Sequence, residues 1–270
     1  MNIFTALLIQ PLANGLILFY RLLWGNMGLA IIAFSTALRF LTLPLTRTYL
    51  DSMKKMKELE PAIAKLRERH RDDKTKLLQA QSELYKQKGV NPGAGCLPYL
   101  LQIVILIALF NVFSRALAPD GDTMSKFNEL LYAPLKFNSG ETLNTKFLYL
   151  DITRPDAFRL PGVPFPIPGP TLILAALLQF ASAKIMTPYQ KIEEKLAKRT
   201  RQTVDDMQVA IQQSMVYTFP LFTLIIGLSF PSGLALYWLL FSFWQFYQQY
   251  KTSGWGGLTP FLVRMKFLKD

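Results

Sequence analysis

Long apolar runs alternate with polar, charged segments along this chain of 270 residues. A helix of roughly 20 predominantly apolar residues is long enough to cross the hydrocarbon core of a bilayer. The runs that approach this length are predicted to be transmembrane helices, and they cover residues 27–48, 97–117, 169–187, 212–229 and 232–250. The pattern therefore predicts an all-α integral membrane protein with five transmembrane helices.

The beginning of the chain, residues 1–26, is also apolar, but polar residues and a proline interrupt it. Gln10, Pro11, Asn14 and Arg21 fall inside this run. A helix with one apolar and one polar side is typical of the membrane interface, where it lies parallel to the bilayer surface. We expect residues 1–26 to form an interfacial amphipathic helix and not a sixth span.

The largest polar segment, residues 49–90, shows helical periodicity on both sides of a charged turn at residues 71–74. The two apolar stripes consist of Met53, Met56, Leu59, Ile63 and Leu66 and of Leu77, Leu78, Leu84 and Tyr85. We predict a helical hairpin outside the membrane. The other polar segments are the connections 118–168 and 188–211 and the tail 251–270.

Composition and charge support the membrane assignment and add an orientation. Hydrophobic residues make up 51% of the chain, and the formal net charge is +12. Lys and Arg number twelve in residues 46–96, five in 188–211 and four in 251–270, whereas residues 118–168 carry five together with six acidic residues. Because cytoplasmic loops are enriched in Lys and Arg, we expect the hairpin and the carboxyl terminus in the cytoplasm and the amino terminus outside. Anionic lipid explains the basic charge better than nucleic acid does.

The chain lacks the residue combinations that catalysis or metal binding requires. Residues 91–96 are glycine-rich, but no Lys-Ser or Lys-Thr follows them, as it does in a phosphate-binding loop. His70 is the single histidine and Cys96 the single cysteine, which is too few for a catalytic triad or a zinc site. We therefore expect no enzyme activity, no metal and no cofactor. No basic, cleavable segment opens the chain, which predicts insertion without processing.

Arg39 lies in the middle of the first apolar run. A guanidinium at mid-bilayer costs roughly 2.5–3.5 kcal/mol on insertion scales, so it requires water, a partner or a function. Ser35, Thr42 and Thr46 recur with it at helical spacing and share one face. This face indicates a hydrated, positively charged surface inside the protein. The alternative is an arginine that extends from the helix to the lipid headgroups.

Uncharged polar residues occur in each of the other apolar runs. They are Gln102, Asn111, Gln179, Ser182, Ser214, Tyr217, Thr218, Ser242 and Gln245. Such residues either hydrogen-bond neighbouring helices to one another or line a shared hydrophilic cavity. We expect a substrate-binding groove lined by Ser35, Arg39, Thr42, Gln102, Gln179, Tyr217 and Thr218. Because the runs contain no carboxylate, Arg39 is suited to attract an acidic group from another molecule.

Three stretches of the sequence are similar to the YidC family of membrane protein insertases, whose relatives serve mitochondria and chloroplasts. The first is RFLTLPLT at residues 39–46, which continues into SMKKMKELEP at residues 52–61. The second is NPGAGCLPYLLQ at residues 91–102, and the third is FPSGLALYW at residues 230–238. Their order and spacing agree with the family over residues 3–250.

The resemblance implies five transmembrane helices around a hydrophilic groove that is open to the cytoplasm and to lipid and closed to the outside. Arg39 matches the groove arginine, and Ser35 matches a polar groove position. The implied function is insertion of short hydrophilic tails and of single or few transmembrane segments into the bacterial cytoplasmic membrane. The implied partners are client membrane proteins and lipids, with the ribosome and the Sec translocon as further candidates. In the last span, this chain has Phe241-Ser242 where the family often has Ser-Asn.

Two other functions are compatible with the sequence. A small anion transporter or pore could use Arg39 as its binding site, although the internal repeats and paired broken helices typical of transporters are not detectable. A purely structural assembly factor for membrane complexes would not require Arg39. An experiment that measures both client insertion and anion passage distinguishes an anion transporter or pore from an insertase.

Overall fold

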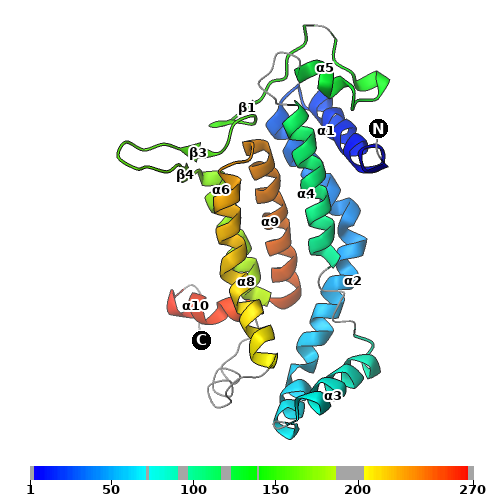
Figure 1. Cartoon of the computed structure of the whole chain (residues 1–270), viewed down its shortest axis with the longest axis vertical. Helices are drawn as coiled ribbons and strands as arrows, with labels where there is room; N and C mark the ends of the chain where they lie inside the picture. Colours follow the sequence, from blue (N-terminus) through cyan, green and yellow to red (C-terminus); the bar gives the residue numbers. More distant parts are fainter. Residues whose placement is uncertain are drawn as a thin grey trace. The chain divides into compact units, whose positions relative to one another are not determined.

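The computed structural model describes residues 3–70, 73–90, 97–116, 123–138, 140–186 and 204–266, most of them in helices (Figure 1). This confirms the prediction of a mainly helical protein. The helices are η1 (Thr5–Ile9), α1 (Gln10–Leu22), α2 (Met27–Arg69), α3 (Lys74–Gln87), α4 (Leu97–Ala116), α5 (Thr123–Asn128), η3 (Ala133–Leu135), α6 (Pro170–Met186), α8 (Val204–Gly227), α9 (Ser232–Ser253), η4 (Gly256–Leu258) and α10 (Thr259–Arg264). Two small antiparallel hairpins pair β1 (Lys146–Phe147) with β2 (Leu150–Asp151) and β3 (Ala157–Phe158) with β4 (Ile167–Pro168).

The chain divides into two compact units, and helices α2, α4, α6, α8 and α9 contribute residues to both. Unit 1 consists of Met1–Leu41, Leu100–Leu178 and Phe219–Trp244. Unit 2 consists of Thr42–Tyr99, Gln179–Thr218 and Gln245–Asp270. Both units have buried residues of their own.

Apolar windows long enough to cross a membrane occur twice among the described residues, at Thr5–Leu22 and at Met27–Pro44. Shorter apolar helices cover Leu101–Phe113, Pro170–Ile185 and Val216–Gly227. The number of membrane spans and the interfacial placement of residues 1–26 stay predictions, because length and composition alone do not decide between a span and an interfacial helix.

Helix α2 is longer than the predicted elements. It runs from Met27 to Arg69 and contains Pro44 and Pro61. It thus joins the predicted span 27–48 to the first arm of the predicted hairpin 49–90. The predicted boundary followed the change from apolar to polar residues. Such a change marks where a membrane can end, but a helix continues as long as its backbone bonds do.

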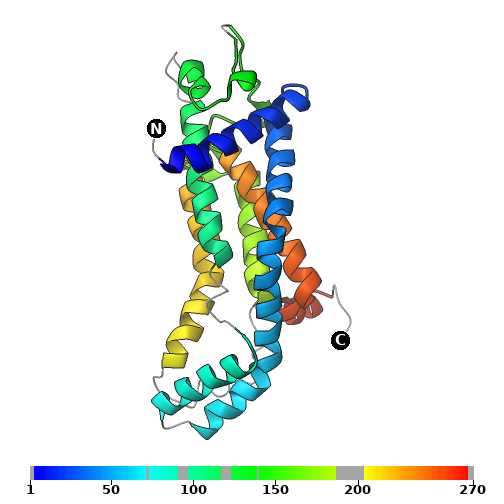
Figure 2. The ribbon, with the colours of Figure 1, turned by 90° about the vertical axis from the view of Figure 1, so that its right-hand side faces the viewer.

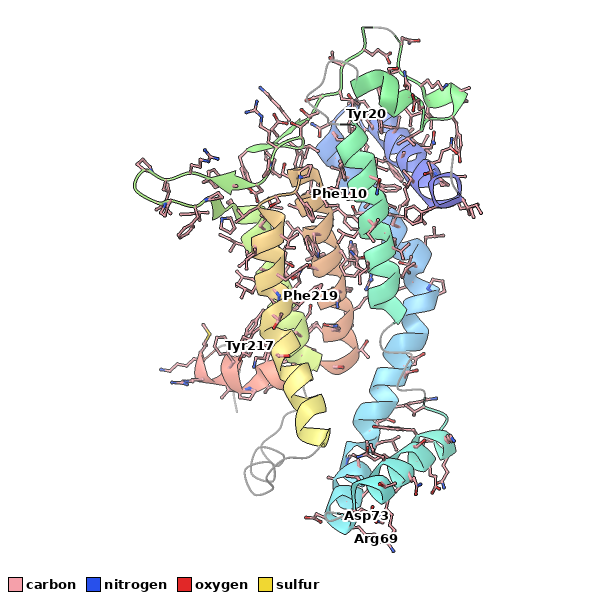
Figure 3. The ribbon with its side chains drawn as sticks, in the orientation of Figure 1. Tyr20, Arg69, Asp73, Phe110, Tyr217 and Phe219 are labelled. Carbon is pink, nitrogen blue, oxygen red and sulfur yellow. The ribbon has the colours of Figure 1, made fainter. Side chains whose placement is uncertain are left out.

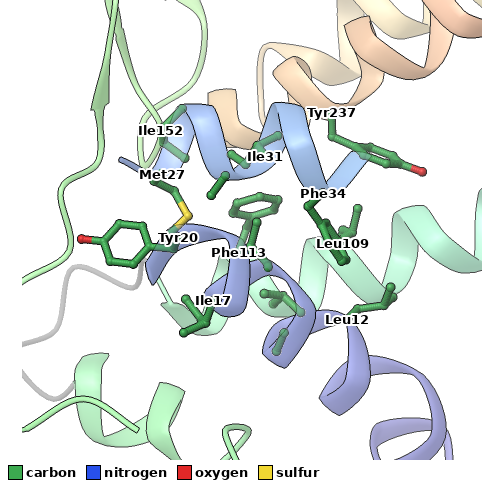
Figure 4. Close-up of a cluster of buried hydrophobic side chains, with 14 of the residues drawn as sticks. Leu12, Ile17, Tyr20, Met27, Ile31, Phe34, Leu109, Phe113, Ile152 and Tyr237 are labelled. Carbon is green, nitrogen blue, oxygen red and sulfur yellow. The ribbon is translucent and has the colours of Figure 1, made fainter. Parts of the chain in front are cut away.

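The core of unit 1 lies where α1, α2 and α4 meet. Figure 4 shows Ile17 of α1 and Ile31 of α2 close to Phe113 of α4, with Tyr237 of α9 at the edge of the cluster. Ile17, Ile31 and Phe113 are all at most 2% exposed. Burial of a side chain of this size is worth roughly 1.5–3 kcal/mol relative to exposure to water. The core therefore fixes α1 against the first turns of α2.

Helix α1 crosses α2 and α4 instead of running alongside them (Figure 2). Its polar side chains bind the connection between α4 and α6. Asn14 Nδ2 donates to Leu130 O at 2.9 Å, and Asn14 Oδ1 accepts from Tyr132 N at 2.7 Å. Tyr20 Oη accepts from Asn144 N at 3.0 Å. Asn14, which interrupts the apolar run, and Tyr20 thus have partners outside their own helix.

The α4–α6 connection also binds the first turn of α9. Ser232 N donates to Arg154 O at 2.7 Å, and Gly233 N donates to Ile152 O at 3.1 Å. Ser232 Oγ donates to Asp151 O at 2.7 Å. A Cβ at Gly233 would lie 2.6 Å from Ile152 Cγ2, so this close approach requires glycine. The contacts satisfy amides that a helix start otherwise leaves unpaired.

A second set of contacts, which we call the α6 clasp, consists of Tyr149, Asp156, Thr171 and Leu172. Asp156 is 3% exposed, and its Oδ2 accepts from Leu172 N at 3.1 Å and from Tyr149 Oη at 3.2 Å. Tyr149 Oη in turn accepts from Thr171 N at 2.9 Å. A carboxylate is favourable at the amino-terminal end of a helix because the helix dipole is positive there. The clasp thereby fixes the connection to the start of α6.

In unit 2, the end of α2 and helix α3 form the predicted helical hairpin. Arg69 and Asp73 lie at its tip (Figure 3). Asp73 caps α3, because its Oδ1 accepts from Lys76 N at 3.0 Å. This backbone hydrogen bond, followed by the side-chain contact with Lys76, lowers the pKa of Asp73.

The hairpin follows the predicted pattern in part. Ile63 and Leu77 are each 8% exposed, as the two apolar stripes require, but Leu78 is 48% exposed. Leu78 directly follows Leu77, and adjacent residues on a helix point about 100° apart, so only one of them can face the seam. The predicted turn residues Arg71 and Asp72 lie outside the described residues.

Candidate functional site

Arg39 is buried within unit 1. The residue is 9% exposed, and its Cζ lies 5.3 Å from the centre of the Phe241 ring on α9. Arg39 follows the start of α2 at Met27 by 12 positions, or about 18 Å of helix. A guanidinium over an aromatic ring gains about 0.5–2 kcal/mol, with the larger values at sites removed from water. This partner stabilises the cation without neutralising its charge.

A buried hydrogen-bonded pair lies on the neighbouring turn of α9. Tyr237 precedes Phe241 by one helical turn, and its hydroxyl donates to Gln102 Oε1 on α4 at 3.1 Å. Tyr237 is 4% exposed and Gln102 is 6% exposed. Arg39 and Tyr237 are close enough to interact electrostatically. The geometry therefore brings the predicted residues Arg39 and Gln102 together with Tyr237 and Phe241.

Gln102 has one donor group left over. Among the described residues, no acceptor lies within hydrogen-bond distance of its Nε2. A buried amide that lacks an acceptor costs about 1–3 kcal/mol unless water or another molecule supplies one. Gln102 is thus able to donate to a water molecule or to a carbonyl group that enters the site.

Ser35 is 5% exposed. Its hydroxyl donates to Ile31 O of the same helix at 2.5 Å. The neighbouring Thr36 makes the contact between helices, since its Oγ1 accepts from Trp244 Nε1 at 3.4 Å. Trp244 also packs edge-on against Phe40, with ring centres 5.5 Å apart.

The other predicted site residues belong to unit 2. Gln179 is 5% exposed, Thr42 is half-buried, Tyr217 is 59% exposed and Thr218 is exposed. Tyr217 projects from α8 (Figure 3) and lies beside Phe180 of α6, with ring centres 5.7 Å apart. The seven predicted residues thus fall into two groups, of which Ser35, Arg39 and Gln102 lie in unit 1.

Lys184 forms a second cation–aromatic cluster, within unit 2. Its Nζ lies 5.2 Å from the centre of the Tyr217 ring and 5.8 Å from that of Phe180. Phe180 and Lys184 are one helical turn apart on α6, so both side chains face α8. The sequence reasoning treated Lys184 only as a part of the third apolar run.

Sequence reasoning also missed the aromatic residues of α9 that contact α2. Tyr237, Phe241 and Trp244 follow one another at steps of four and three residues, so they share a face of the helix. That spacing was a usable signal. In an apolar helix, however, an aromatic stripe indicates lipid contact as readily as contact with a cation.

Among the residues that the structure describes, no group of three or more His, Cys, Asp or Glu side chains is placed to hold a metal ion. His70 lies half-buried next to the hairpin tip. Cys96 and the rest of the glycine-rich stretch 91–96 lie outside the described residues. The chemistry available in the described site is electrostatic attraction and hydrogen bonding.

The described part of the chain is mainly helical, and it combines apolar helices with a buried cation at Arg39. The family model described as "60Kd inner membrane protein" matches residues 18–259, and the chain belongs to this family. The sequence resemblance to the YidC insertases is thereby confirmed.

Individual relatives carry the name "Membrane protein insertase YidC". One from Pelobacter propionicus is 34% identical over 233 residues, which cover 86% of this chain and 35% of the relative. One from Shewanella sp. (strain ANA-3) is 36% identical over 226 residues, which cover 83% of this chain and 33% of the relative. The chain thus spans about a third of the length of these curated relatives.

Proposed function

We propose that this chain is a membrane protein insertase of the bacterial cytoplasmic membrane. It moves short hydrophilic tails and single or few transmembrane segments of client proteins from the cytoplasm into the bilayer. The observation that carries the proposal is the buried Arg39 over Phe241 in a chain that belongs to the inner membrane protein family. A cation at such a depth is functional by default.

Hydrophobic partition supplies the driving force. Transfer of apolar surface from water to hydrocarbon is worth about 25 cal/mol per Å², so a client segment of about 20 apolar residues needs no nucleotide to enter the bilayer. The barrier lies in the client's hydrophilic tail, which must cross at the same time. The insertase lowers that barrier by offering polar contacts part of the way across.

Arg39 provides the central contact for the tail. Two unit charges 4 Å apart attract each other by about 4 kcal/mol at an effective dielectric constant of about 20, against about 1 kcal/mol in water. An acidic tail therefore gains more from Arg39 than it could gain from a cation in bulk solvent. Gln102 adds a hydrogen-bond donor for a backbone carbonyl of the tail.

The remaining predicted groove residues are proposed from the sequence. Thr42, Gln179, Tyr217 and Thr218 are proposed to line the groove together with Ser35. Tyr217 supports this role because it is 59% exposed. The client's apolar segment would slide along the lipid-facing sides of α6 and α9, which are the third and fifth predicted spans.

The proposed orientation has the amino terminus outside and the helical hairpin in the cytoplasm. Support comes from the distribution of Lys and Arg and from the contacts of α1 with the α4–α6 connection. A helix bound along its polar side to an extramembrane connection fits an interfacial placement. Added protease should leave the hairpin intact in whole cells, and cleavage at residues 73–90 from outside would overturn the orientation. The ribosome and the Sec translocon stay candidate partners.

The proposal is tested with the purified chain in liposomes. A short single-span client with an acidic tail is added, and its protected fraction is compared with the release of a trapped small anion. Protection of the client without release of the anion supports an insertase. Anion release without client protection would establish a transporter or pore. If the client were protected to the same extent in liposomes without the protein, the proposed insertase activity would be contradicted.

A further inference from the structure

The segment between the two strands of the second β-hairpin has an unusual composition. Residues 157–168, which we call the apolar hairpin, read AFRLPGVPFPIP and contain one polar side chain, that of Arg159. The hairpin extends away from the start of α6 (Figure 1). Strands exposed to water normally alternate apolar and polar residues. The apolar hairpin lacks this alternation.

None of the residues of the apolar hairpin is buried in the protein. Its largest side chains are Phe158, Leu160 and Phe165, which are 47%, 52% and 64% exposed. A continuous exposed apolar surface of this kind indicates contact with another molecule or with a membrane. The position of the hairpin relative to α6 distinguishes between these two.

Helix α6 is short for a membrane span. Lys184 lies in its last turn, where a cation marks the headgroup level of the cytoplasmic side. From Pro170 to Lys184 the helix rises about 21 Å at 1.5 Å per residue. The hydrocarbon core is about 30 Å thick. With Lys184 at the inner headgroups, Pro170 therefore falls about 9 Å short of the outer ones. Only Gly169 separates Pro170 from the apolar hairpin.

The backbone of the apolar hairpin suits a location with little water. An unpaired N–H group in lipid costs several kcal/mol, and proline has no N–H group. Residues 161, 164, 166 and 168 are prolines. The β3–β4 ladder pairs Phe158 with Ile167, and Val163 N donates to Leu160 O at 3.2 Å. The hairpin thus presents fewer free donors than most loops of its length.

The junction with α6 holds the hairpin in place. The α6 clasp binds Asp156, the residue before the hairpin, to the first turn of α6. Tyr149 of the clasp stacks on Phe158 at the hairpin base, with ring centres 6.2 Å apart. The depth of the hairpin is therefore coupled to the depth of α6.

We infer that the apolar hairpin is seated in the outer leaflet of the membrane. Phe158, Leu160 and Phe165 lie among the upper acyl chains, and the guanidinium of Arg159 binds lipid phosphate. The hairpin runs sideways from the start of α6 (Figure 1), so it lies along the outer leaflet and anchors the outer end of the short α6 there. This inference rests on the proposed orientation of α6.

The test measures the depth of spin labels in nanodiscs that contain one full-length chain and bacterial-type lipids, so that lipid is the only partner present. Cys96 is replaced by Ser, and single nitroxide labels are attached at Leu160→Cys or Phe165→Cys. The matched control is Glu141→Cys, which replaces an exposed residue of the same α4–α6 connection. Collision rates are measured with oxygen, which concentrates in acyl chains, and with a nickel chelate, which stays in water.

Labels at Leu160 and Phe165 should collide more with oxygen and less with the nickel chelate than the label at Glu141. Arg159→Glu should shift the Leu160 label toward the control values, because a carboxylate is repelled by phosphate. The same collision rates at all three sites would overturn the inference and leave a protein partner as the occupant. A membrane-impermeant thiol reagent added to cells tests the orientation separately: failure of Glu141→Cys to react would refute the proposed topology itself.

Discussion

Each unit places a cation against aromatic rings, but the two cations differ in burial and in what surrounds them. Arg39 of unit 1 is 9% exposed and has the half-buried Phe241 beneath it. Lys184 of unit 2 is half-buried and lies over Tyr217, which is 59% exposed. A cation in water-accessible surroundings is screened and contributes little to binding. Both cations have aromatic partners, but Arg39 is more deeply buried than Lys184. Burial is therefore what makes Arg39 the stronger candidate for function.

The same contrast holds for the two aspartates that bind helix starts. Asp156 of unit 1 is buried and contacts residues 7 to 16 positions away. Asp73 of unit 2 has a side chain that is 42% exposed, and it caps its own helix through Lys76, three positions away. Asp156 thus joins the α4–α6 connection to a helix, whereas Asp73 stabilises only the start of its own helix.

Among the substitutions that test this contrast between the two units, Asp156→Ala should cause the largest loss of stability. It removes hydrogen bonds from Leu172 N and Tyr149 Oη to a buried carboxylate, and hydrogen bonds to charged groups are worth about 1.5–3 kcal/mol each. We expect a loss of about 3 kcal/mol in stability, measured as a fall in the melting temperature of the detergent-solubilised chain. Asp156→Asn keeps an acceptor oxygen and should lose less. Equal melting temperatures for Asp156→Ala and Asp73→Ala would contradict the distinction between the units.

Arg39→Ala should reduce the insertion of a client with an acidic tail by at least about tenfold, which corresponds to about 1.4 kcal/mol. A matched client with a neutral tail should lose much less, because it relies on hydrophobic partition. Arg39→Lys keeps the charge but not the planar set of donors, so it should retain part of the activity. The inserted fraction in liposomes is the measurement.

Lys184→Ala is the matched control for Arg39→Ala, since it removes a cation that also lies over an aromatic ring. It should leave both clients nearly unaffected. If Arg39→Ala reduced acidic and neutral clients to the same extent, Arg39 would support the fold or hydrate the site, and charge attraction would not be its role.

Phe241→Leu should have a smaller effect than Arg39→Ala. The substitution keeps an apolar side chain but removes the ring beneath the guanidinium, a contact worth about 0.5–2 kcal/mol. We expect a loss of about threefold in insertion of the acidic client, at the lower end of that range. Phe180→Leu in unit 2 should not change insertion. An equal loss for both variants would show that the ring beneath Arg39 has no special part in insertion.

The sequence singles out Arg39 as a cation inside an apolar run, but it does not reveal which residues surround that cation. Arg39 stands out because a charge inside an apolar run is costly, and Gln102 stands out for the same reason on a smaller scale. Phe241 and Trp244 do not, because aromatic residues are ordinary in apolar helices. Their role depends on which face of α9 meets α2, and helix packing decides that face.

The order of the α4–α6 connection was also beyond prediction. The sequence predicts a single loop over residues 118–168, whereas the structure has α5, η3 and two β-hairpins within this range. Asn14 contacts residues 116 and 118 positions away, and no local periodicity signals such pairs. Helix α3 (Lys74–Gln87) differs in this respect, because the apolar stripe that predicts a helix there is a local feature of the sequence.

The pH dependence of the α3 cap should be the smallest effect. The pKa of Asp73 is lowered by the backbone N–H of Lys76, then by the Lys76 side chain. The cap therefore contributes its full stabilisation above the unfolded-state pKa of about 3.9 and loses it as the pH falls through the lower folded-state pKa.

Hydrogen exchange of the first turn of α3, corrected for the intrinsic exchange rates, measures this stabilisation. Asp73→Ala should increase exchange near neutral pH, where the wild-type carboxylate is charged, and the difference should shrink in acid. A difference of the same size at pH 7 and at about pH 2, well below the reference value, would mean that the charge of Asp73 does not stabilise the hairpin.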